Sequence, residues 1–126
     1  MPYERTATAT ILGLRIIYGA GLIAAPERLA RRWLGPASGS GPTQVALRAL
    51  GAREIVLHAG ALTTFLSGGA VRRWLIASIV GDLTDVAATA LARDGLPDGA
   101  APATLLVGGG SALVTAALAA ALTRSQ

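Results

Sequence analysis

The chain has 126 residues, of which 52% are hydrophobic and 14% charged, and it carries a formal net charge of +4 with no cysteine. This length favours a single domain, and the composition is more apolar than that of a typical soluble protein. The lack of cysteine excludes disulfides and thiolate metal sites. The basic residues, all arginines, are spread from Arg5 to Arg124 rather than gathered in one stripe, so nucleic acid is not an expected partner.

Four apolar segments follow one another along the chain, at about 6–25, 45–66, 74–92 and 103–122. Each has roughly 20 residues, the length that an α-helix needs to cross about 30 Å of hydrocarbon. Glycines and prolines separate the segments and predict short turns. We therefore predict an all-α fold in which residues 1–126 form one domain, a four-helix transmembrane up-down bundle.

Residues 27–34, between the first two segments, have the pattern of a short amphipathic helix. Leu29 and Trp33 are i,i+4 neighbours, and the three arginines of this stretch can stay in water. We expect this helix to lie at the membrane interface. A second Arg-Arg-Trp-Leu run, at 72–75, opens the third segment and marks the opposite face of the bilayer. Arginines are balanced between the two faces, so the positive-inside rule leaves the orientation open.

Ionisable residues interrupt the first three apolar segments, although an unpaired one costs about 2.5–3.5 kcal/mol at the centre of a membrane helix. They are Arg15 in the first segment, Arg48, Arg53, Glu54 and His58 in the second, and Asp82 and Asp85 in the third. Three arginines thus balance three carboxylates, and we expect a nearly neutral cluster that joins these segments. The fourth segment has no charged residue, and we expect it to serve as packing support.

Polar residues also form a narrow stripe on the third segment. At 100° per residue, Ser78, Asp82, Asp85 and Thr89 fall within roughly 60° of one another. Such a stripe on an otherwise apolar helix faces a partner or a cavity. On the first segment, Tyr18 shares a side with Arg15.

A carboxylic acid held among apolar residues stays protonated and acts as a proton donor when a base completes the pair. We predict an acid/base enzyme, an isomerase, cyclase or epoxide-opening enzyme, whose substrate is lipophilic because it enters from the lipid. The predicted catalytic residues are Asp82, Asp85, Glu54 and His58. The predicted substrate-binding residues are Arg15, Tyr18, Arg48 and Arg53.

Three alternatives stay open at this point. The charged residues form a purely structural ion-pair network in a membrane scaffold, or they couple to ions or substrate in a small transporter that assembles as a homo-oligomer. In the third alternative the chain is a soluble helical bundle and its charges face water. The uncharged fourth segment argues against this last alternative because it has no solvated face.

The sequence gives little reason to expect a metal or a cofactor. Glu54 and His58 have the i,i+4 spacing of a helical ligand pair, but the chain has a single histidine, and nearby arginines repel a metal ion. The glycines at 108–110 lie inside the fourth apolar segment and indicate close helix packing rather than a phosphate-binding loop. The expected partners are the lipid bilayer and a lipophilic small molecule.

Three short motifs carry a resemblance to a known kind of protein. They are LRIIYG at 14–19, RALGARE at 48–54 and GDLTD at 81–85. In this order the motifs resemble those of the small four-helix integral membrane proteins of unknown function that are common in actinobacteria, and they are faintly similar to DoxX-like membrane proteins. The resemblance implies a multi-pass topology in a bacterial cell membrane, without catalytic residues to carry over.

Overall fold

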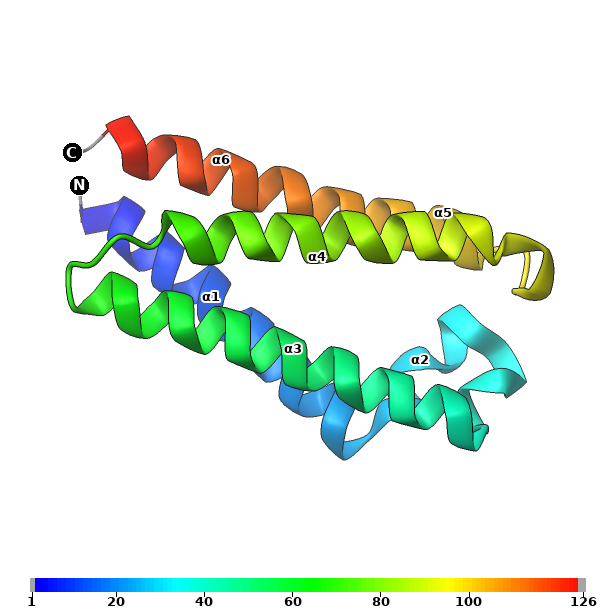
Figure 1. Ribbon diagram of the computed structural model, residues 1–126. Coiled ribbons are helices and arrows are strands. Elements are labelled where there is room, and N and C mark those ends of the chain that lie inside the picture. Colours follow the sequence, from blue (N-terminus) through cyan, green and yellow to red (C-terminus); the bar gives the residue numbers. More distant parts are fainter. Residues whose placement is uncertain (1, 125–126) are drawn as a thin grey trace.

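The computed structural model describes residues 2–124, which are all-helical and contain no strand (Figure 1). The predicted all-α class is therefore confirmed over these residues. The first half of the chain consists of α1 (Pro2–Ala24), α2 (Pro26–Leu34), the short 3-10 turn η1 (Gly35–Gly39) and α3 (Gly41–Leu66). The second half consists of α4 (Arg72–Leu91), the turn η2 (Arg93–Gly95), α5 (Ala100–Thr104), the π-helical turn η3 (Leu105–Gly109) and α6 (Gly110–Arg124).

Three helical stretches of the described chain are long and apolar enough to cross a membrane. They are Tyr3–Ala24, Arg72–Leu91 and Ala100–Leu122, and the last runs without a break through α5, η3 and most of α6. They correspond to the first, third and fourth predicted segments. The second predicted segment forms α3, the longest helix at 26 residues, but α3 is not among the three stretches.

The expected amphipathic helix between the first two segments is present as α2. Its arginines are exposed, as predicted, and its Ala30 is buried with Leu22 of α1 and Leu47 of α3. Trp33 packs against the same cluster. The helix therefore rests on the adjoining ends of α1 and α3, and its place at a membrane interface stays a prediction.

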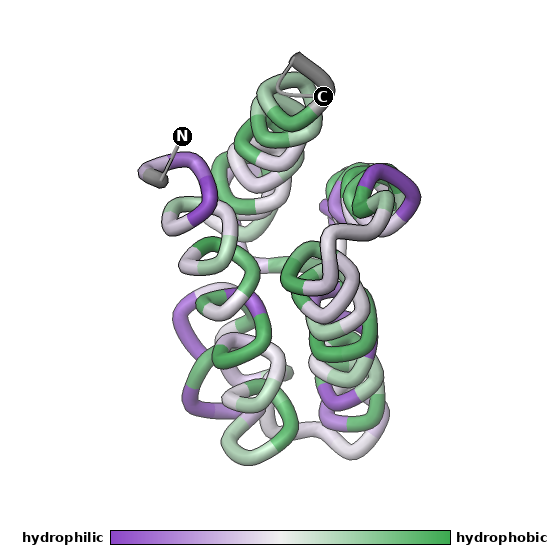
Figure 2. Tube along the Cα trace, turned by 90° about the vertical axis from the view of Figure 1, so that its left-hand side faces the viewer, coloured by the Kyte–Doolittle hydropathy of each residue, from purple (hydrophilic) through white to green (hydrophobic). Residues whose placement is uncertain are grey.

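The long helices pack in two pairs, α1 with α3 and α4 with α6, and α3 also contacts α4 (Figure 1). The start of α1, the α3–α4 turn and the end of α6 lie at one end of the molecule, while α2 and the α4–α5 turn lie at the other. Figure 2 shows hydrophobic residues around the long helices rather than on one face only. Large apolar side chains accordingly point outward, among them Ile17, Val56, Val80, Leu83, Leu106 and Leu113.

Two glycines set the closest approach of α1 and α3. A Cβ atom on Gly19 would lie 2.6 Å from the carbonyl oxygen of Gly51, and a Cβ atom on Gly51 would lie equally close to the carbonyl oxygen of Gly19. Only a residue without a side chain fits where two helix backbones come this near. Arg15 lies one turn before Gly19 and Glu54 one turn after Gly51, so the antiparallel crossing brings these two side chains together.

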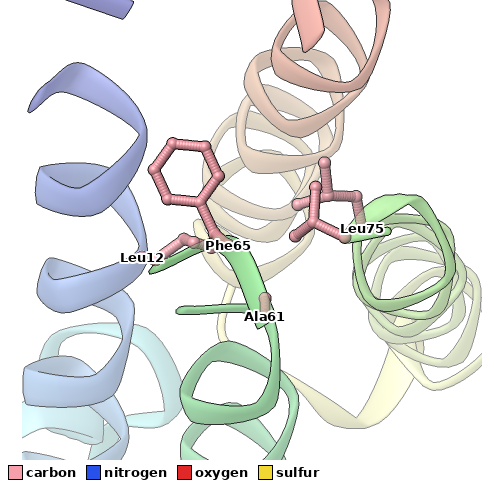
Figure 3. Packing of buried hydrophobic residues seen from close by; sticks show 5 residues of the cluster. Leu12, Ala61, Phe65 and Leu75 are labelled. Carbon is pink, nitrogen blue, oxygen red and sulfur yellow. The ribbon is translucent and has the colours of Figure 1, made fainter. Parts of the chain in front are cut away.

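Apolar clusters lie on both sides of the charged residues along the helices. One contains Leu12, Phe65 and Leu75, together with Ala61 and Val71 (Figure 3). The other is the cluster under α2. The charged side chains thus lie between two apolar clusters, and an unpaired charge is expensive where it is buried.

Candidate functional site

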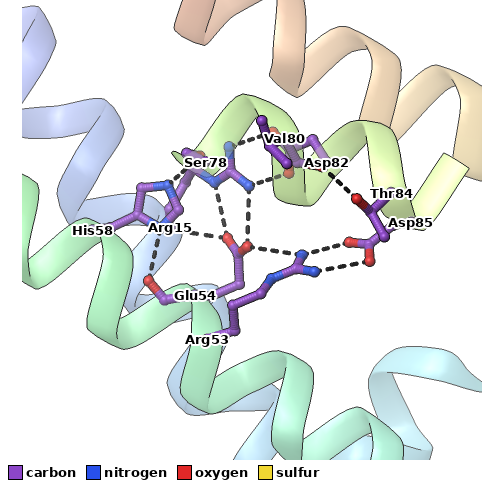
Figure 4. Close-up of polar contacts among 9 residues, drawn as sticks. All are labelled: Arg15, Arg53, Glu54, His58, Ser78, Val80, Asp82, Thr84 and Asp85. Atoms are coloured by element: carbon purple, nitrogen blue, oxygen red, sulfur yellow. Dashed lines mark hydrogen bonds and ion pairs between the residues drawn. The ribbon is translucent and has the colours of Figure 1, made fainter. Parts of the chain in front are cut away.

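Arg15 is the centre of the charged cluster and joins three helices (Figure 4). Its Nε donates to Glu54 Oε2 over 2.9 Å and its Nη2 to Glu54 Oε1 over 3.2 Å. On its other side, Nη1 donates to Asp82 Oδ2 over 2.8 Å and Nη2 to Asp82 Oδ1 over 2.5 Å. The side chains of Glu54 and Asp82 are 2% and 5% exposed. One guanidinium therefore holds two buried carboxylates, each through both oxygens.

Arg53 and Asp85 form a second pair between α3 and α4. Nη1 of Arg53 donates to Asp85 Oδ1 over 2.9 Å and Nη2 to Oδ2 over 2.5 Å, and both side chains are about one third exposed, at 31% and 35%. The guanidinium lies against Gly81, where a Cβ atom would come within 3.3 Å of Arg53 Cζ. Nη2 of Arg53 is also 3.6 Å from Glu54 Oε1. The Arg53–Asp85 pair is therefore in contact with the group formed by Arg15, Glu54 and Asp82.

His58 lies next to Glu54 on α3 and is 1% exposed. Its Nδ1 is 2.7 Å from the backbone carbonyl oxygen of Glu54, and its Nε2 is 2.9 Å from Ser78 Oγ. A carbonyl oxygen only accepts, so Nδ1 carries the hydrogen, and Nε2 of the neutral ring accepts from the Ser78 hydroxyl. Both ring nitrogens are thereby hydrogen-bonded, Nδ1 within α3 and Nε2 across to Ser78 of α4.

The expectation that Arg48 belongs to the cluster is wrong. Arg48 is exposed, and it donates to the backbone carbonyl of Ile23 over 3.2 Å and to Gln44 Oε1 over 2.8 Å. Six residues of helix separate it from Glu54, which places it about 120° round the helix and about 9 Å along its axis. The cluster thus contains two arginines and three carboxylates among the described residues, and the predicted balance of three against three does not hold.

A cavity of about 410 Å³ lies over this cluster. Arg15, Glu54, Asp82 and Asp85 form its charged floor. Its walls are mostly apolar and include Leu14, Tyr18, Leu29, Trp33 and Leu50. The Leu29–Trp33 pair, which the sequence assigned to the membrane interface, therefore also faces the cavity.

The fourth segment supplies the remaining wall of the cavity, so its predicted role as packing support alone is wrong. Ala103, Thr104, Val107 and Gly108 line the cavity, and Val107 and Gly108 belong to the π-helical turn η3. Such turns are frequent at functional sites because they shift the helix face by one residue. Gly108 packs against the backbone of Asp82, where a Cβ atom would lie 3.3 Å from the carbonyl oxygen.

A second cavity, of about 430 Å³, borders the Arg53–Asp85 pair and shares Trp33, Leu50 and Asp85 with the first. Two buried donors near it, Trp33 Nε1 and Arg53 Nε, have no hydrogen-bond partner among the described residues. Thr89, from the predicted polar stripe, also lines this cavity. Asp85 therefore borders both cavities, whereas Asp82 borders only the first.

The described residues contain no group of three or more histidine, cysteine or acidic residues that could hold a metal ion. Both oxygens of Glu54, Asp82 and Asp85 accept hydrogen bonds from arginine. The predicted acid/base reaction needs a carboxyl group that donates a proton to the substrate, and each of these carboxyl groups would have to give up a bond to arginine to do so.

No protein-family model matches the chain, and no curated protein or solved structure is significantly similar to it. The resemblance to small four-helix membrane proteins therefore stays a prediction.

The structure brings together most of the residues that the sequence indicated. Arg15, Arg53, Glu54, Asp82 and Asp85 form one network. Tyr18 lines the cavity above it, while His58 lies behind the network and does not line the cavity. Sequence reasoning missed Trp33, Leu50 and the fourth segment as parts of the cavity, because apolar residues of a helix carry no signal for which hollow they border.

Proposed function

We propose that the chain is a multi-pass protein of a bacterial cell membrane, built as a four-helix up-down bundle in which α3 is the second span. Support comes from the three apolar helices and from the large apolar side chains that point outward. The charges of α3 fit this proposal because Glu54 and Arg53 find their partners on α1 and α4. Pairing inside the bundle removes most of the cost of about 2.5–3.5 kcal/mol for each lone charge.

The topology is testable because the chain has no cysteine of its own. Single cysteines at Ala37 and Asp94 report one end of the molecule, and a cysteine at Ser67 reports the other; all three positions are exposed. In sealed spheroplasts, we expect a membrane-impermeant maleimide to label either the first two variants or the third. Labelling of all three variants from one side, with the membrane intact, contradicts the four-span topology.

We further propose that the cavity over the charged cluster binds a lipophilic small molecule. The observation that supports this proposal is the structure of the cavity, which has a volume of about 410 Å³ and apolar walls above a charged floor. This volume lies within the range of about 300–1,000 Å³ for small-molecule sites, and such sites combine apolar walls with a few placed polar groups.

Acid/base conversion of that molecule, by isomerisation, cyclisation or epoxide opening, is a second candidate function. The observation that favours it is that Glu54, Asp82 and Asp85 all border the same cavity. Because their oxygens accept from arginine, these carboxylates suit the stabilisation of a developing positive charge better than the donation of a proton. Binding is therefore the primary proposal.

Ligand binding is tested with the protein in nanodiscs of zwitterionic lipid. The chain has two tryptophans, and Trp74→Phe leaves Trp33, which lines the cavity, as the only fluorophore of this kind. Three bromophenyl probes are compared: 4-bromobenzyltrimethylammonium, its neutral carbon isostere 1-bromo-4-neopentylbenzene, and the anion 4-bromobenzylsulfonate. We expect at least one probe to quench Trp33 by saturable binding, since bromine quenches indole fluorescence on contact.

Two matched variants of the fourth segment serve as controls. Ala103→Phe fills the cavity wall and should abolish the saturable quenching. Ala117→Phe makes the same change at an exposed position that does not line the cavity, and it should leave the quenching unchanged. Absence of saturable quenching by all three probes, or equal quenching in the Ala103→Phe variant, contradicts the proposed binding function.

A further inference from the structure

We propose that the ligand of this cavity is a lipophilic monocation, an organic ammonium or comparable cation with an apolar body. This inference rests on the proposed binding function and names the class of its ligand. It follows from the charges of the floor. Arg53 and Asp85 neutralise each other, but Arg15 is shared between Glu54 and Asp82. The Arg15–Glu54–Asp82 unit therefore carries one negative charge in excess.

The described structure places no other cation where it could cancel this excess. Arg48 is exposed and bonded to Ile23 and Gln44, and the arginines of α2 are exposed as well. The fourth segment contributes no charged residue to the cavity wall. His58 is the remaining titratable group beside Glu54, and its Nδ1 lies 3.6 Å from Glu54 Oε2. As a neutral ring it satisfies both of its hydrogen bonds, to the Glu54 carbonyl and to Ser78, and it then adds no positive charge.

The buried, apolar surroundings strengthen the electrostatic effect of this excess charge. Glu54 and Asp82 are almost fully buried, and the walls of the cavity are mostly apolar. In such a medium water screens charges weakly, so a unit charge acts over several ångströms and its lack of compensation is costly. A cation that enters the cavity restores neutrality without breaking the bonds of Arg15.

The geometry favours an organic cation over a metal ion. A metal ion needs several oxygen ligands in direct coordination, whereas the described residues contain no group of three or more metal-ligating side chains, and the Arg15 guanidinium between Glu54 and Asp82 repels a metal ion. An organic cation needs only proximity to the negative unit and a surface for its apolar body. The rings of Tyr18 and Trp33 border the same cavity, and aromatic faces attract organic cations.

The three bromophenyl probes test whether the cavity prefers a cation. They are compared on the Trp74→Phe chain, in which the charged cluster is wild-type. The benzyltrimethylammonium probe and its neopentyl isostere have the same shape and differ by one charge. After correction for partition into protein-free nanodiscs, we expect the cation to bind about tenfold more tightly than the isostere. The benzylsulfonate anion should show no saturable binding.

Asp82→Asn removes the excess charge and keeps an acceptor for Arg15. In this variant we expect the preference for the cation over the isostere to fall below about threefold, while the isostere binds as before. Arg48→Gln removes a charge of the same helix bundle that lies outside the cluster, and it should keep the wild-type preference. The comparison of probes on the wild-type chain does not depend on how well either variant folds.

The outcomes separate the two proposals. Saturable binding of the isostere or the anion at least as tight as that of the cation overturns the monocation inference and leaves the binding function standing. Failure of all three probes refutes the binding function itself. An unchanged cation preference in a folded Asp82→Asn protein also contradicts the inference, because the preference would then have another source.

Discussion

Arg15 and Glu54 lie 39 residues apart in the sequence and share two hydrogen bonds, of 2.9 and 3.2 Å. Because the same guanidinium also holds Asp82 through two bonds, a single side chain of α1 fixes the positions of α3 and α4. Bidentate hydrogen bonds have a narrow geometry, so they constrain how the three helices are rotated relative to one another. The floor of the cavity is therefore set by Arg15.

Replacement of Arg15 by leucine should be the most destabilising change in the network. It leaves Glu54 and Asp82 buried, charged and without their shared partner, and the removal of one member of a buried ion pair costs about 3–5 kcal/mol. Unfolding in mixed detergent micelles, followed by circular dichroism, measures the loss.

Two further variants show whether the loss of charge pairing is the reason that Arg15→Leu is destabilising. Arg15→Lys keeps the charge but lacks the planar fork, so its stability should lie between the wild type and the leucine variant. The triple variant Arg15→Leu, Glu54→Leu, Asp82→Leu removes all three charges and should recover most of the lost stability, since apolar replacement of a buried ionic group is often neutral or stabilising. A triple variant no more stable than Arg15→Leu would contradict this explanation.

Asp82 and Asp85 lie one turn apart on α4 and should differ in their contribution to stability. Asp82 is 5% exposed and Asp85 35% exposed. Loss of hydrogen bonds to a buried charged group costs about 1.5–3 kcal/mol, and the cost is smaller for a side chain that is less fully enclosed. We therefore expect Asp82→Ala to lower the free energy of unfolding more than Asp85→Ala, and equal losses would show that the two pairs are equally enclosed.

The helix crossing is tested by two alanine substitutions within α1. A Cβ atom on Gly19 meets the backbone oxygen of Gly51, while a Cβ atom on Gly13 meets no atom within 4 Å. Gly19→Ala should push α1 from α3 and weaken the Arg15–Glu54 bonds. Gly13→Ala should be neutral or stabilising by up to about 1 kcal/mol, because alanine is the better helix former. Thermal unfolding of both variants gives the comparison, and a Gly19→Ala protein as stable as Gly13→Ala would place the close contact elsewhere.

The hydrogen bond between Ser78 and His58 should be structural rather than part of ligand binding. Ser78→Ala removes the donor to Nε2 and leaves that nitrogen buried and unpaired, at a cost of about 1–3 kcal/mol. Neither residue lines the cavity, so the affinity for the bromophenyl probes should not change. In ¹⁵N spectra of the imidazole we expect the hydrogen on Nδ1 in the wild type. Altered probe affinity in a folded Ser78→Ala protein would contradict this prediction and show that the His58–Ser78 pair affects ligand binding.

Much of the fold follows from local features of the sequence. The four apolar stretches and the Gly/Pro breaks gave helices close to the expected bounds, and the amphipathic stretch of α2 formed a helix with exposed arginines. The polar stripe on α4 followed from helical periodicity, and its Ser78, Asp82 and Thr89 are buried against neighbouring helices. These features depend on one helix at a time, so one sequence suffices to predict them.

The cavity could not be predicted in the same way. Periodicity gives the angle of a residue on its own helix but not the rotation or height of the next helix, and for this reason the sequence does not predict that Arg48 lies outside the cluster. The π-helical turn at Leu105–Gly109 also has no clear signature in an uncharged run of small residues. Hence the fourth segment was expected to provide packing alone.

The sequence by itself determined that this protein is helical, that its long helices are apolar almost all round, and that three of them carry charges in their middle. Only the tertiary structure decided which charges meet. The Gly19–Gly51 contact sets the height at which α1 crosses α3, and that height places Arg15 between Glu54 and Asp82 and leaves Arg48 outside. The excess negative charge below the cavity is thus a property of the crossing geometry, because charges neutralise one another in space and not in sequence.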